Sequence, residues 1–195
     1  MIPDLPGEER EMQVLILSGS RDPNGRTASA ADALLQGVLG KGSQGEQIFL
    51  TKMNIERCRQ CEDSGWGICR TEGRCVIEDD FASLVGKIKS ADAVVFATPV
   101  YFGDLSESMR AFLDRLRRTC MNDNGKDGIS GKPAIGICVA GGGGGGAPTC
   151  TVSLEKVLRT CGFDLLDLIP VRRQNLDMKL HVLKMTGEWL SALGS

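Results

Sequence analysis

Short apolar runs alternate with helix-like stretches along nearly the whole chain, and this alternation constrains the fold more than any other feature of the sequence. The apolar runs lie at residues 12–17, 46–50, 91–100, 133–140 and 163–171. The helical patterns lie at residues 28–39, 79–90, 104–118, 151–162 and 175–193. Because nearly continuous apolar runs are typical of parallel strands with both faces buried, the pattern predicts an α/β fold with a mostly parallel sheet covered by helices on both sides.

Length and charge narrow the class of protein. A chain of 195 residues with 42% hydrophobic residues is long enough to bury a core, and we expect a single domain over residues 1–195. The formal net charge of -2, with no block of basic residues, argues against a nucleic-acid-binding protein. No apolar run approaches the roughly 18 residues of a membrane span, and the polar start "MIPDLPGEEREM" lacks the pattern of a signal peptide. We therefore expect a cytoplasmic protein with no membrane or nucleic-acid partner.

The turn after the first apolar run, "SGSRDPNGRT" at residues 18–27, is rich in groups that bind anions. It offers hydroxyls at Ser18, Ser20 and Thr27 and a positive charge at Arg26. A predicted helix follows at once, and the free N–H groups at a helix start favour anions. The Gly-Lys-Ser/Thr ending of a diphosphate-binding loop is absent, so the turn predicts a site for a single phosphate. The alternative is that Thr27 only caps the helix and that the rest is a solvated turn.

Two further unusual loops follow the third and fourth apolar runs. The stretch "TPVYFGDLS" places Tyr101 and Phe102 at the end of a strand, in a chain with only 5% aromatic residues. Six consecutive glycines, residues 141–146, would let the backbone lie against a flat ligand. Because ligands of open parallel sheets bind beyond the carboxyl ends of the strands, the three loops together predict a site for a phosphorylated planar heterocycle, with FMN as the natural candidate. The alternatives are that the two rings seal the edge of the core and that the glycines form a linker.

These segments, together with "SMRAFLDRL" at residues 108–116, resemble the flavodoxin-like NAD(P)H-dependent FMN reductases, close to the iron–sulfur flavoprotein branch. The resemblance implies a flavodoxin-like, doubly wound, five-stranded parallel sheet with strand order 2-1-3-4-5. It implies that the phosphate contacts are Ser18, Ser20, Arg26 and Thr27. It implies that the flavin contacts are Pro99, Val100, Tyr101, Phe102, Gly103, Gly141 and Gly142. It also implies a homodimer or homotetramer in which a neighbouring subunit helps to enclose the flavin.

Four of the eight cysteines crowd one segment, residues 55–78, which is inserted after the second predicted strand. The pattern is Cys-x2-Cys-x7-Cys-x5-Cys, formed by Cys58, Cys61, Cys69 and Cys75. Four thiolates can hold an iron–sulfur cluster or a zinc ion, and a redox-active Cys58/Cys61 pair or reduced cysteines without metal are the other readings. The resemblance implies a [4Fe–4S] cluster, although iron–sulfur flavoproteins have only two residues between the second and third cysteines, where this chain has seven.

The chain shows no group of side chains spaced for nucleophilic or acid–base catalysis. We expect the other four cysteines to lie in the core, and His181, the single histidine, to be a surface or packing residue. FMN would then carry the chemistry of an oxidoreductase, which takes a hydride from NAD(P)H and passes electrons to a quinone, a flavin or another small acceptor, with a ferredoxin as a partner if a cluster is bound. The alternatives are a flavodoxin-type electron carrier with no hydride substrate and a zinc-stabilised module without catalytic activity.

Overall fold

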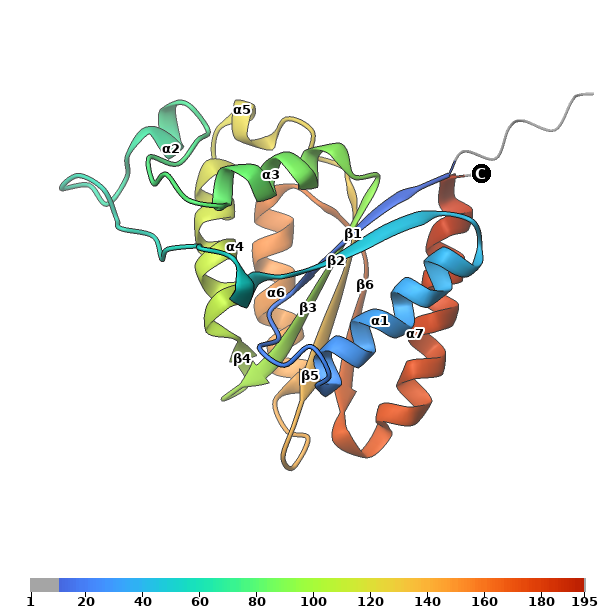
Figure 1. Cartoon of the computed structure of the whole chain (residues 1–195). Helices are drawn as coiled ribbons and strands as arrows, with labels where there is room; N and C mark the ends of the chain where they lie inside the picture. The colour runs from blue at the N-terminus through green and yellow to red at the C-terminus, as the bar shows by residue number, and fades with distance from the viewer. Residues whose placement is uncertain (1–10, 195) are drawn as a thin grey trace, which may run out of the picture.

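A mainly parallel sheet with helices on both faces forms the centre of the computed structural model, which describes residues 11–194 (Figure 1). The hydrogen-bonded order of its parallel strands is β2-β1-β3-β5-β6. These strands are β1 (Gln13–Ser18), β2 (Gln44–Phe49), β3 (Ala93–Tyr101), β5 (Pro133–Ala140) and β6 (Asp164–Arg172). The predicted α/β class and the parallel sheet are therefore confirmed. The order of the strands reverses at β1, so the carboxyl ends of β1 and β3 lie side by side at the switch point where such sheets bind ligands.

The prediction of five strands in the order 2-1-3-4-5 is wrong in one respect, because a sixth strand is present. The short strand β4 (Asp104–Leu105) pairs antiparallel with the end of β3. Phe102 and Gly103 connect the two strands, with φ of 52° and 80°. Positive φ at both central residues is what a two-residue hairpin turn of type I′ requires. The helix that was predicted to start at residue 104 therefore begins only after this hairpin.

Helices cover both faces of the sheet. α1 and α7 pack on one face, while α3, α4 and α6 pack on the other (Figure 1). The helices are α1 (Arg26–Gly40), α2 (Ile68–Thr71), α3 (Phe81–Ser90), α4 (Glu107–Thr119), α5 (Asp123–Lys126), α6 (Ala147–Cys161) and α7 (Leu176–Ser191). Short 3-10 helices are η1 (Leu50–Lys52), η2 (Arg173–Asn175) and η3 (Ala192–Gly194).

Alternate residues along β1 enter two separate cores. Leu15 and Leu17 are buried with the residues of α3, α4 and α6. Val14 and Ile16 are buried with the residues of α1 and α7. Because successive side chains of a strand point to opposite faces, a strand covered on both faces needs apolar residues at every position. This requirement explains the continuous apolar run that predicted the strand.

α1 and α7 lie very close together, and two glycines permit this approach. A Cβ atom at Gly37 in α1 would overlap the backbone of Lys184, and a Cβ atom at Gly187 in α7 would overlap the carbonyl oxygen of Leu34. Contact between the two backbones fixes the rotation of α7 about its own axis. The side of α7 opposite to Gly187 therefore faces away from the protein.

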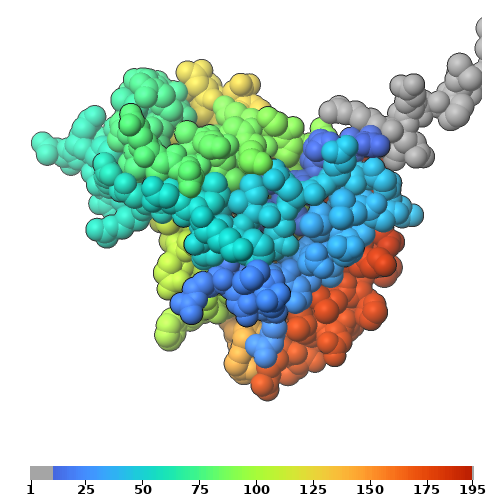
Figure 2. All heavy atoms as spheres, in the orientation of Figure 1, coloured from blue at the N-terminus to red at the C-terminus, as the bar shows by residue number. Residues whose placement is uncertain are grey.

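The cysteine-rich segment, residues 55–78, projects from the body of the molecule beside the C-terminal end of α4 (Figures 1 and 2). Its regular structure is limited to the single turn of α2. The glycine run that joins β5 to α6 lies at the other end of the molecule, close to β4 (Figure 1). The cysteine-rich segment and the glycine run therefore lie far apart in the structure.

None of the helices described between residues 11 and 194 combines the length and the apolar character needed to cross a membrane. The expectation about a signal peptide rests mainly on residues 1–10, which lie outside the described residues.

Candidate functional site

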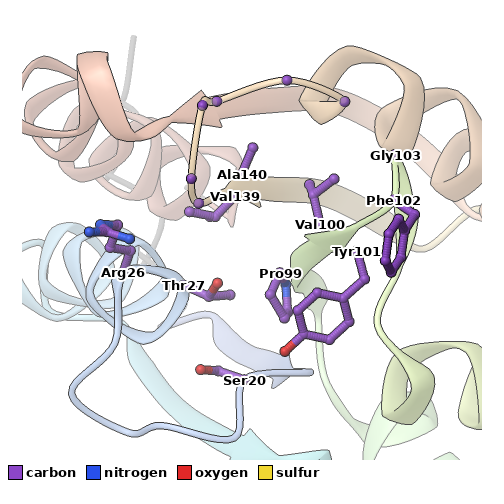
Figure 3. Close-up of a pocket in the computed structure, with 16 residues that line it drawn as sticks. Ser20, Arg26, Thr27, Pro99, Val100, Tyr101, Phe102, Gly103, Val139 and Ala140 are labelled. Atoms are coloured by element: carbon purple, nitrogen blue, oxygen red, sulfur yellow. The ribbon is translucent and has the colours of Figure 1, made fainter.

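The loops that follow β1, β3 and β5 meet at the carboxyl ends of these strands and enclose a cleft of about 710 Å³ (Figure 3). The residues that line it are Ser20, Arg26, Thr27, Pro99, Val100, Tyr101, Phe102, Gly103, Val139, Ala140 and Gly141–Gly146. The volume falls within the range of small-molecule and cofactor sites. The structure thus brings together three loops that are distant in the sequence, with every residue expected to contact a cofactor except Ser18.

Ser18 lies beneath the cleft and not on its lining. Its side chain is buried, and its Oγ accepts a hydrogen bond from the backbone N–H of Ser20 at 3.3 Å. Ser20 Oγ donates to the carbonyl oxygen of Asp22 at 2.8 Å, and Thr51, which follows β2, donates to the carbonyl oxygen of Ser20 at 2.9 Å. The assignment of Ser18 as a phosphate contact is therefore corrected: this hydroxyl shapes the loop, and Thr51 is a supporting residue that the sequence analysis missed.

The N-terminus of α1 opens onto the cleft without the groups that usually neutralise a helix start. Its N-cap is Gly25, which makes no side-chain hydrogen bond, and the first turn contains no acidic residue. Arg26 is the first helical residue, is exposed, and forms no ion pair within residues 11–194. Free N–H groups and a cation at the positive end of a helix dipole favour a bound anion. Thr27 lies inside the helix, so the alternative that it caps the helix is wrong.

A network of hydroxyl groups under the cleft joins the loops after β1 and β3. The backbone N–H of Ser106 donates to Thr98 Oγ1 at 3.1 Å, and Ser106 Oγ caps α4 by accepting from the N–H of Met109 at 3.4 Å. Ser108 Oγ donates to the carbonyl oxygen of Gly19 at 3.2 Å. A Cβ atom at Gly19 would lie 2.5 Å from Ser106 Oγ, so a larger residue there would have to displace the Ser106 hydroxyl from this network. These contacts hold the two loops at a constant separation. In the sequence, a serine just before an amphipathic helix indicates the helix cap at Ser106.

Tyr101 and Phe102 are exposed at the cleft and not packed into the core. The exposed fraction is 44% for Tyr101 and 110% for Phe102. In Figure 3 the Tyr101 ring stands beside Pro99 with its hydroxyl on the side of Ser20, while the Phe102 ring stands at the outer rim. The alternative that the two rings seal the core is therefore wrong. Both rings offer faces on which a planar ligand can stack.

The glycine run is held against the cleft by specific contacts. Gly144 and Gly146 have φ of 78° and 79°, a conformation that residues with a Cβ atom rarely adopt. A Cβ atom at Gly146 would lie 2.7 Å from the Cα atom of Gly103, so this loop and the loop after β3 touch. Gln174 Nε2 donates to the carbonyl oxygen of Gly143 at 2.9 Å. These contacts argue against the linker alternative and in favour of a wall made of bare backbone.

Comparison with known proteins places the chain in a family. The family model described as NADPH-dependent FMN reductase matches residues 12–174. The chain belongs to this family. This FMN reductase family member is 30% identical over 131 residues to an iron–sulfur flavoprotein of Methanocaldococcus jannaschii, a match that covers 67% of this chain and 65% of that protein. It is 29% identical over 110 residues to an iron–sulfur flavoprotein of Methanosarcina thermophila, over 55% of each chain, so the chain spans about half to two thirds of these relatives.

A solved structure shows the same fold. The NAD(P)H:quinone oxidoreductase from Methanothermobacter marburgensis is similar with a TM-score of 0.70 at 20% identity, over 93% of this chain and 96% of that chain. A flavodoxin from the domain Archaea is similar with a TM-score of 0.60 at 14% identity, over 94% and 99% of the two chains. The predicted flavodoxin-like fold is therefore confirmed.

A second, smaller pocket lies beside the C-terminal half of α4, and among its lining residues are the four predicted metal ligands, Cys58, Cys61, Cys69 and Cys75. Arg118 of α4 donates from Nε to Cys58 Sγ at 3.2 Å, and its guanidinium lies 4.3 Å from the centre of the Trp66 ring. Within residues 11–194, no three Cys, His, Asp or Glu side chains are arranged to hold a metal ion. The structure thus brings the four cysteines to one pocket without placing their sulfur atoms in the geometry of a cluster or a zinc site.

Arg115, which the sequence analysis did not single out, joins the two ends of the cysteine-rich segment. Its buried guanidinium donates to both carboxylate oxygens of Asp79, at 2.6 and 2.9 Å, and to the carbonyl oxygen of Glu56 at 3.1 Å. Burial alone would raise the pKa of Asp79, but hydrogen bonds from Arg115 and from the backbone N–H groups of Glu56 and Phe81 outweigh burial and hold the pKa below its usual range. The sequence does indicate that Arg115 is buried: it follows Phe112 by three residues, a spacing that places both on the buried side of α4.

The remaining four cysteines lie in the core, as predicted, and form two neighbouring pairs that involve α6. Cys138 contacts Cys150, and Cys161 contacts Cys120. The neighbouring thiol and burial raise the pKa of Cys138 and of Cys161 far above the ordinary value. Both thiols therefore stay protonated and act as packing groups. His181 is exposed on α7, as predicted.

Proposed function

We propose that this family member is an FMN-dependent oxidoreductase that uses NAD(P)H. The observation that carries the proposal is the uncapped N-terminus of α1, where Arg26 and free backbone N–H groups border a cleft of cofactor size. Thr27 adds a hydroxyl donor at the same corner of the cleft, where the Ser20 hydroxyl also lies and would have to leave the Asp22 carbonyl oxygen in order to donate to a ligand (Figure 3). One phosphate group would satisfy these donors together. FMN carries one such phosphate, joined through a sugar chain to a planar ring.

The rest of the cleft suits the planar ring of FMN. Pro99–Gly103 form one wall, and the backbone of Gly141–Gly146 forms another. Because the glycine wall carries no Cβ atoms, a flat ring can lie directly against its peptide groups. Tyr101 stands between these walls and the phosphate corner, and Phe102 stands at the rim, where both can stack on a ring (Figure 3).

When bound, FMN would supply the redox chemistry that links hydride transfer from NAD(P)H to the reduction of a quinone, a flavin or another small acceptor. The chain's own residues hold the phosphate, orient the ring, and leave the mouth of the cleft free for the nicotinamide and the acceptor. Of the lining residues, only Arg26 and Tyr101 carry ionisable side chains. We assign neither a role as acid or base, because hydride transfer to a flavin needs no protein group to move a proton at the start.

Mixing the FMN-loaded protein with NADPH or NADH in the absence of oxygen tests this function. We expect one of the two nucleotides to bleach the flavin absorbance rapidly, and a quinone to restore it. Flavin that stays bound but is reduced by neither nucleotide would identify an electron carrier and would overturn the proposal.

Substitution of Arg26 tests the phosphate site. Arg26→Ala removes one charge-assisted contact, worth about 1.5–3 kcal/mol, so FMN affinity should fall roughly tenfold to a hundredfold. Arg21→Ala is the matched control, because Arg21 lies in the same loop and carries the same charge, but does not line the cleft. Quenching of flavin fluorescence during titration measures both affinities. Equal losses in the two variants would mean that the overall charge of the loop matters, and not a phosphate contact at Arg26.

We also propose that the cysteine-rich segment binds a [4Fe–4S] cluster or a zinc ion. The shared pocket supports this proposal, as does the positive charge of Arg118, which contacts Cys58 Sγ and would offset the charge of a metal–thiolate centre. The sulfur atoms as placed do not fit a metal, so we derive no electron-transfer step through one and assign no role to a ferredoxin. Metal analysis of protein purified without oxygen decides the matter: stoichiometric iron or zinc supports the proposal, and the absence of both overturns it. The homo-oligomer that encloses the flavin and the cytoplasmic location stay predictions.

A further inference from the structure

Two adjacent arginines follow the last strand of the sheet and have no ionic partner. Arg172 is the final residue of β6, and Arg173 is the first residue of η2. Both are exposed, and neither forms an ion pair within residues 11–194. Asp177 comes four residues after Arg173, in the first turn of α7, but makes no ion pair with it. We call Arg172 and Arg173 the arginine pair.

Contacts with the glycine run fix the arginine pair relative to the cleft. Arg172 pairs in register with Ala140 of β5, which lines the cleft. A Cβ atom at Gly144 would lie 3.2 Å from the Cβ atom of Arg172, and Gln174 Nε2 donates to the carbonyl oxygen of Gly143 at 2.9 Å. In Figure 1 the glycine run and the connection from β6 to α7 reach the same end of the molecule. The arginine pair therefore lies at the outer side of the glycine run, next to the cleft.

The arginine pair adds more positive charge than one phosphate of the cofactor needs. Arg26 already lies near the other end of the glycine run, where its Nη1 is 3.8 Å from the position of a Cβ atom at Gly141. Arg26 and the uncapped N-terminus of α1 together provide for the phosphate of FMN. Further like charges at the same edge of the sheet repel one another unless an anion lies between them. The surplus charge therefore indicates a second anionic group beside the bound cofactor.

We propose that the arginine pair binds a phosphate monoester on the substrate that stacks on the flavin. This inference rests on the proposed function, because it assumes that FMN occupies the cleft. The planar guanidinium of arginine presents two N–H groups that match two phosphate oxygens, so a pair of arginines can hold one doubly charged phosphate. Neither Arg172 nor Arg173 lines the cleft itself. The phosphate must therefore belong to a part of the substrate that extends past the glycine run.

Two substrates of the proposed reaction carry such a group. NADPH has a phosphate monoester on the 2′ oxygen of its adenosine, and NADH lacks it. Free FMN, as the electron acceptor, has one at the end of its ribityl chain, and riboflavin lacks it. The arginine pair thus selects NADPH over NADH as the donor, or FMN over riboflavin as the acceptor.

Calorimetric titration of the FMN-loaded protein tests the site without turnover. One comparison uses adenosine 2′-phosphate and adenosine, and the other uses additional FMN and riboflavin. In one of the two comparisons the phosphate should raise the affinity about tenfold or more, and Arg172→Ala and Arg173→Ala should each remove most of this gain. High salt should also reduce the gain, because exposed charges are screened.

Two further variants control this titration. Arg173→Lys keeps the charge but not the planar fork and should retain only part of the gain. Lys156→Ala should retain all of it, because Lys156 is an exposed cation on α6 that does not line the cleft. Circular dichroism and the bound flavin verify that each variant folds. A phosphate that adds no affinity in either comparison, or alanine variants that behave like Lys156→Ala in both, would overturn the arginine site.

Steady-state kinetics identifies the substrate that carries the phosphate. If it is the donor, Arg173→Ala should lower kcat/KM for NADPH about tenfold more than kcat/KM for NADH. If it is the acceptor, the same variant should lower kcat/KM for free FMN by that factor more than kcat/KM for riboflavin. Equal losses in both comparisons would overturn the site as a determinant of specificity. Flavin that neither nucleotide reduces would instead overturn the proposed function, and the titrations would still decide whether the arginine pair binds a phosphate.

Discussion

Phe102 adopts a backbone conformation that destabilises the fold, and its ring gains nothing from burial. A non-glycine residue with φ of 52° carries strain of about 1 kcal/mol or more. The ring is completely exposed at the rim of the cleft. Such strain persists where a residue serves binding or chemistry. We interpret Phe102 as a residue that contacts the flavin or the substrate that stacks on it.

Phe102→Asn separates stability from binding at this position. Asn followed by glycine is the preferred pair for a tight hairpin turn. The free energy of unfolding of the variant should therefore be about 1 kcal/mol higher than that of the wild type. Loss of the ring should at the same time weaken FMN binding or raise the KM for NAD(P)H several-fold. Thermal unfolding of the FMN-free protein and flavin titration measure the two effects. Phe102→Tyr keeps both ring and strain and should change neither; a variant that binds FMN and NAD(P)H as the wild type does would show that the ring has no such role.

The buried pair of Arg115 and Asp79 makes stability depend on pH. The pKa of Asp79 is below its usual value in the folded state, so the pair contributes its full stabilisation above the unfolded-state pKa of about 3.9 and loses it as the pH falls through the lower, folded value. Asp79→Asn should lower the free energy of unfolding by about 3–5 kcal/mol at neutral pH, because it leaves a buried guanidinium unpaired. Denaturant unfolding at several pH values measures this cost. Below about pH 4, the difference in free energy of unfolding between wild type and variant should become smaller. A difference that stays constant with pH would contradict the assignment of Asp79 as the ionised partner of Arg115.

At the scale of elements, α4 connects the two candidate sites. Its N-terminus is capped by Ser106, which also contacts Thr98 in the floor of the cleft. Its C-terminal half carries Arg115 and Arg118, which reach the cysteine-rich segment. A helix of 13 residues is about 20 Å long, so it keeps the sites apart at a constant distance.

The close contact between α1 and α7 limits which residues α7 can carry at the contact point. Alanine is about 1 kcal/mol more favourable than glycine inside a helix, so Gly187→Ala should by itself stabilise α7. Its Cβ atom, however, would overlap the carbonyl oxygen of Leu34, and such overpacking costs about 1–3 kcal/mol. We therefore expect a net loss of stability. Gly86→Ala in α3 is the control, since no atom lies within 4 Å of the new Cβ, and it should stabilise the protein by about 0.5–1 kcal/mol. Equal effects of the two substitutions in thermal unfolding would mean that α7 yields to relieve the overlap.

At the scale of the whole molecule, the cleft and the cysteine pocket lie at opposite ends of α4, and their binding properties should be separable. Cys58→Ser together with Cys75→Ser should abolish metal binding while changing FMN affinity by less than about twofold, because neither residue approaches the cleft. Metal content and flavin titration on the same preparation measure both. The control is Cys138→Ser, which alters a buried packing thiol and should lower stability without changing metal content. Loss of FMN from the Cys58/Cys75 variant would show that the two sites are coupled.

Much of the cleft was accessible from the sequence because its composition is local. The hydroxyls before α1, the aromatic pair after β3 and the glycine run after β5 each stand out within a few residues, and the parallel sheet obliges them to meet at one edge. The hairpin of β4 was missed because Phe102 is an unusual residue for a turn with positive φ. Ser18 was misplaced because the sequence does not show whether a hydroxyl at the end of a strand points into the cleft or under the loop.

The sequence by itself determined the parallel α/β fold, the three loops around the cleft and the buried cysteines, since hydrophobic periodicity and loop composition act over short stretches of chain. Only the tertiary structure decided that Arg115 joins both ends of the cysteine-rich segment, that the four cysteines share a pocket without metal geometry, and that α7 keeps a second apolar face uncovered. Each of these depends on which residues far apart in the chain come into contact, and that is set by how the helices pack on the sheet.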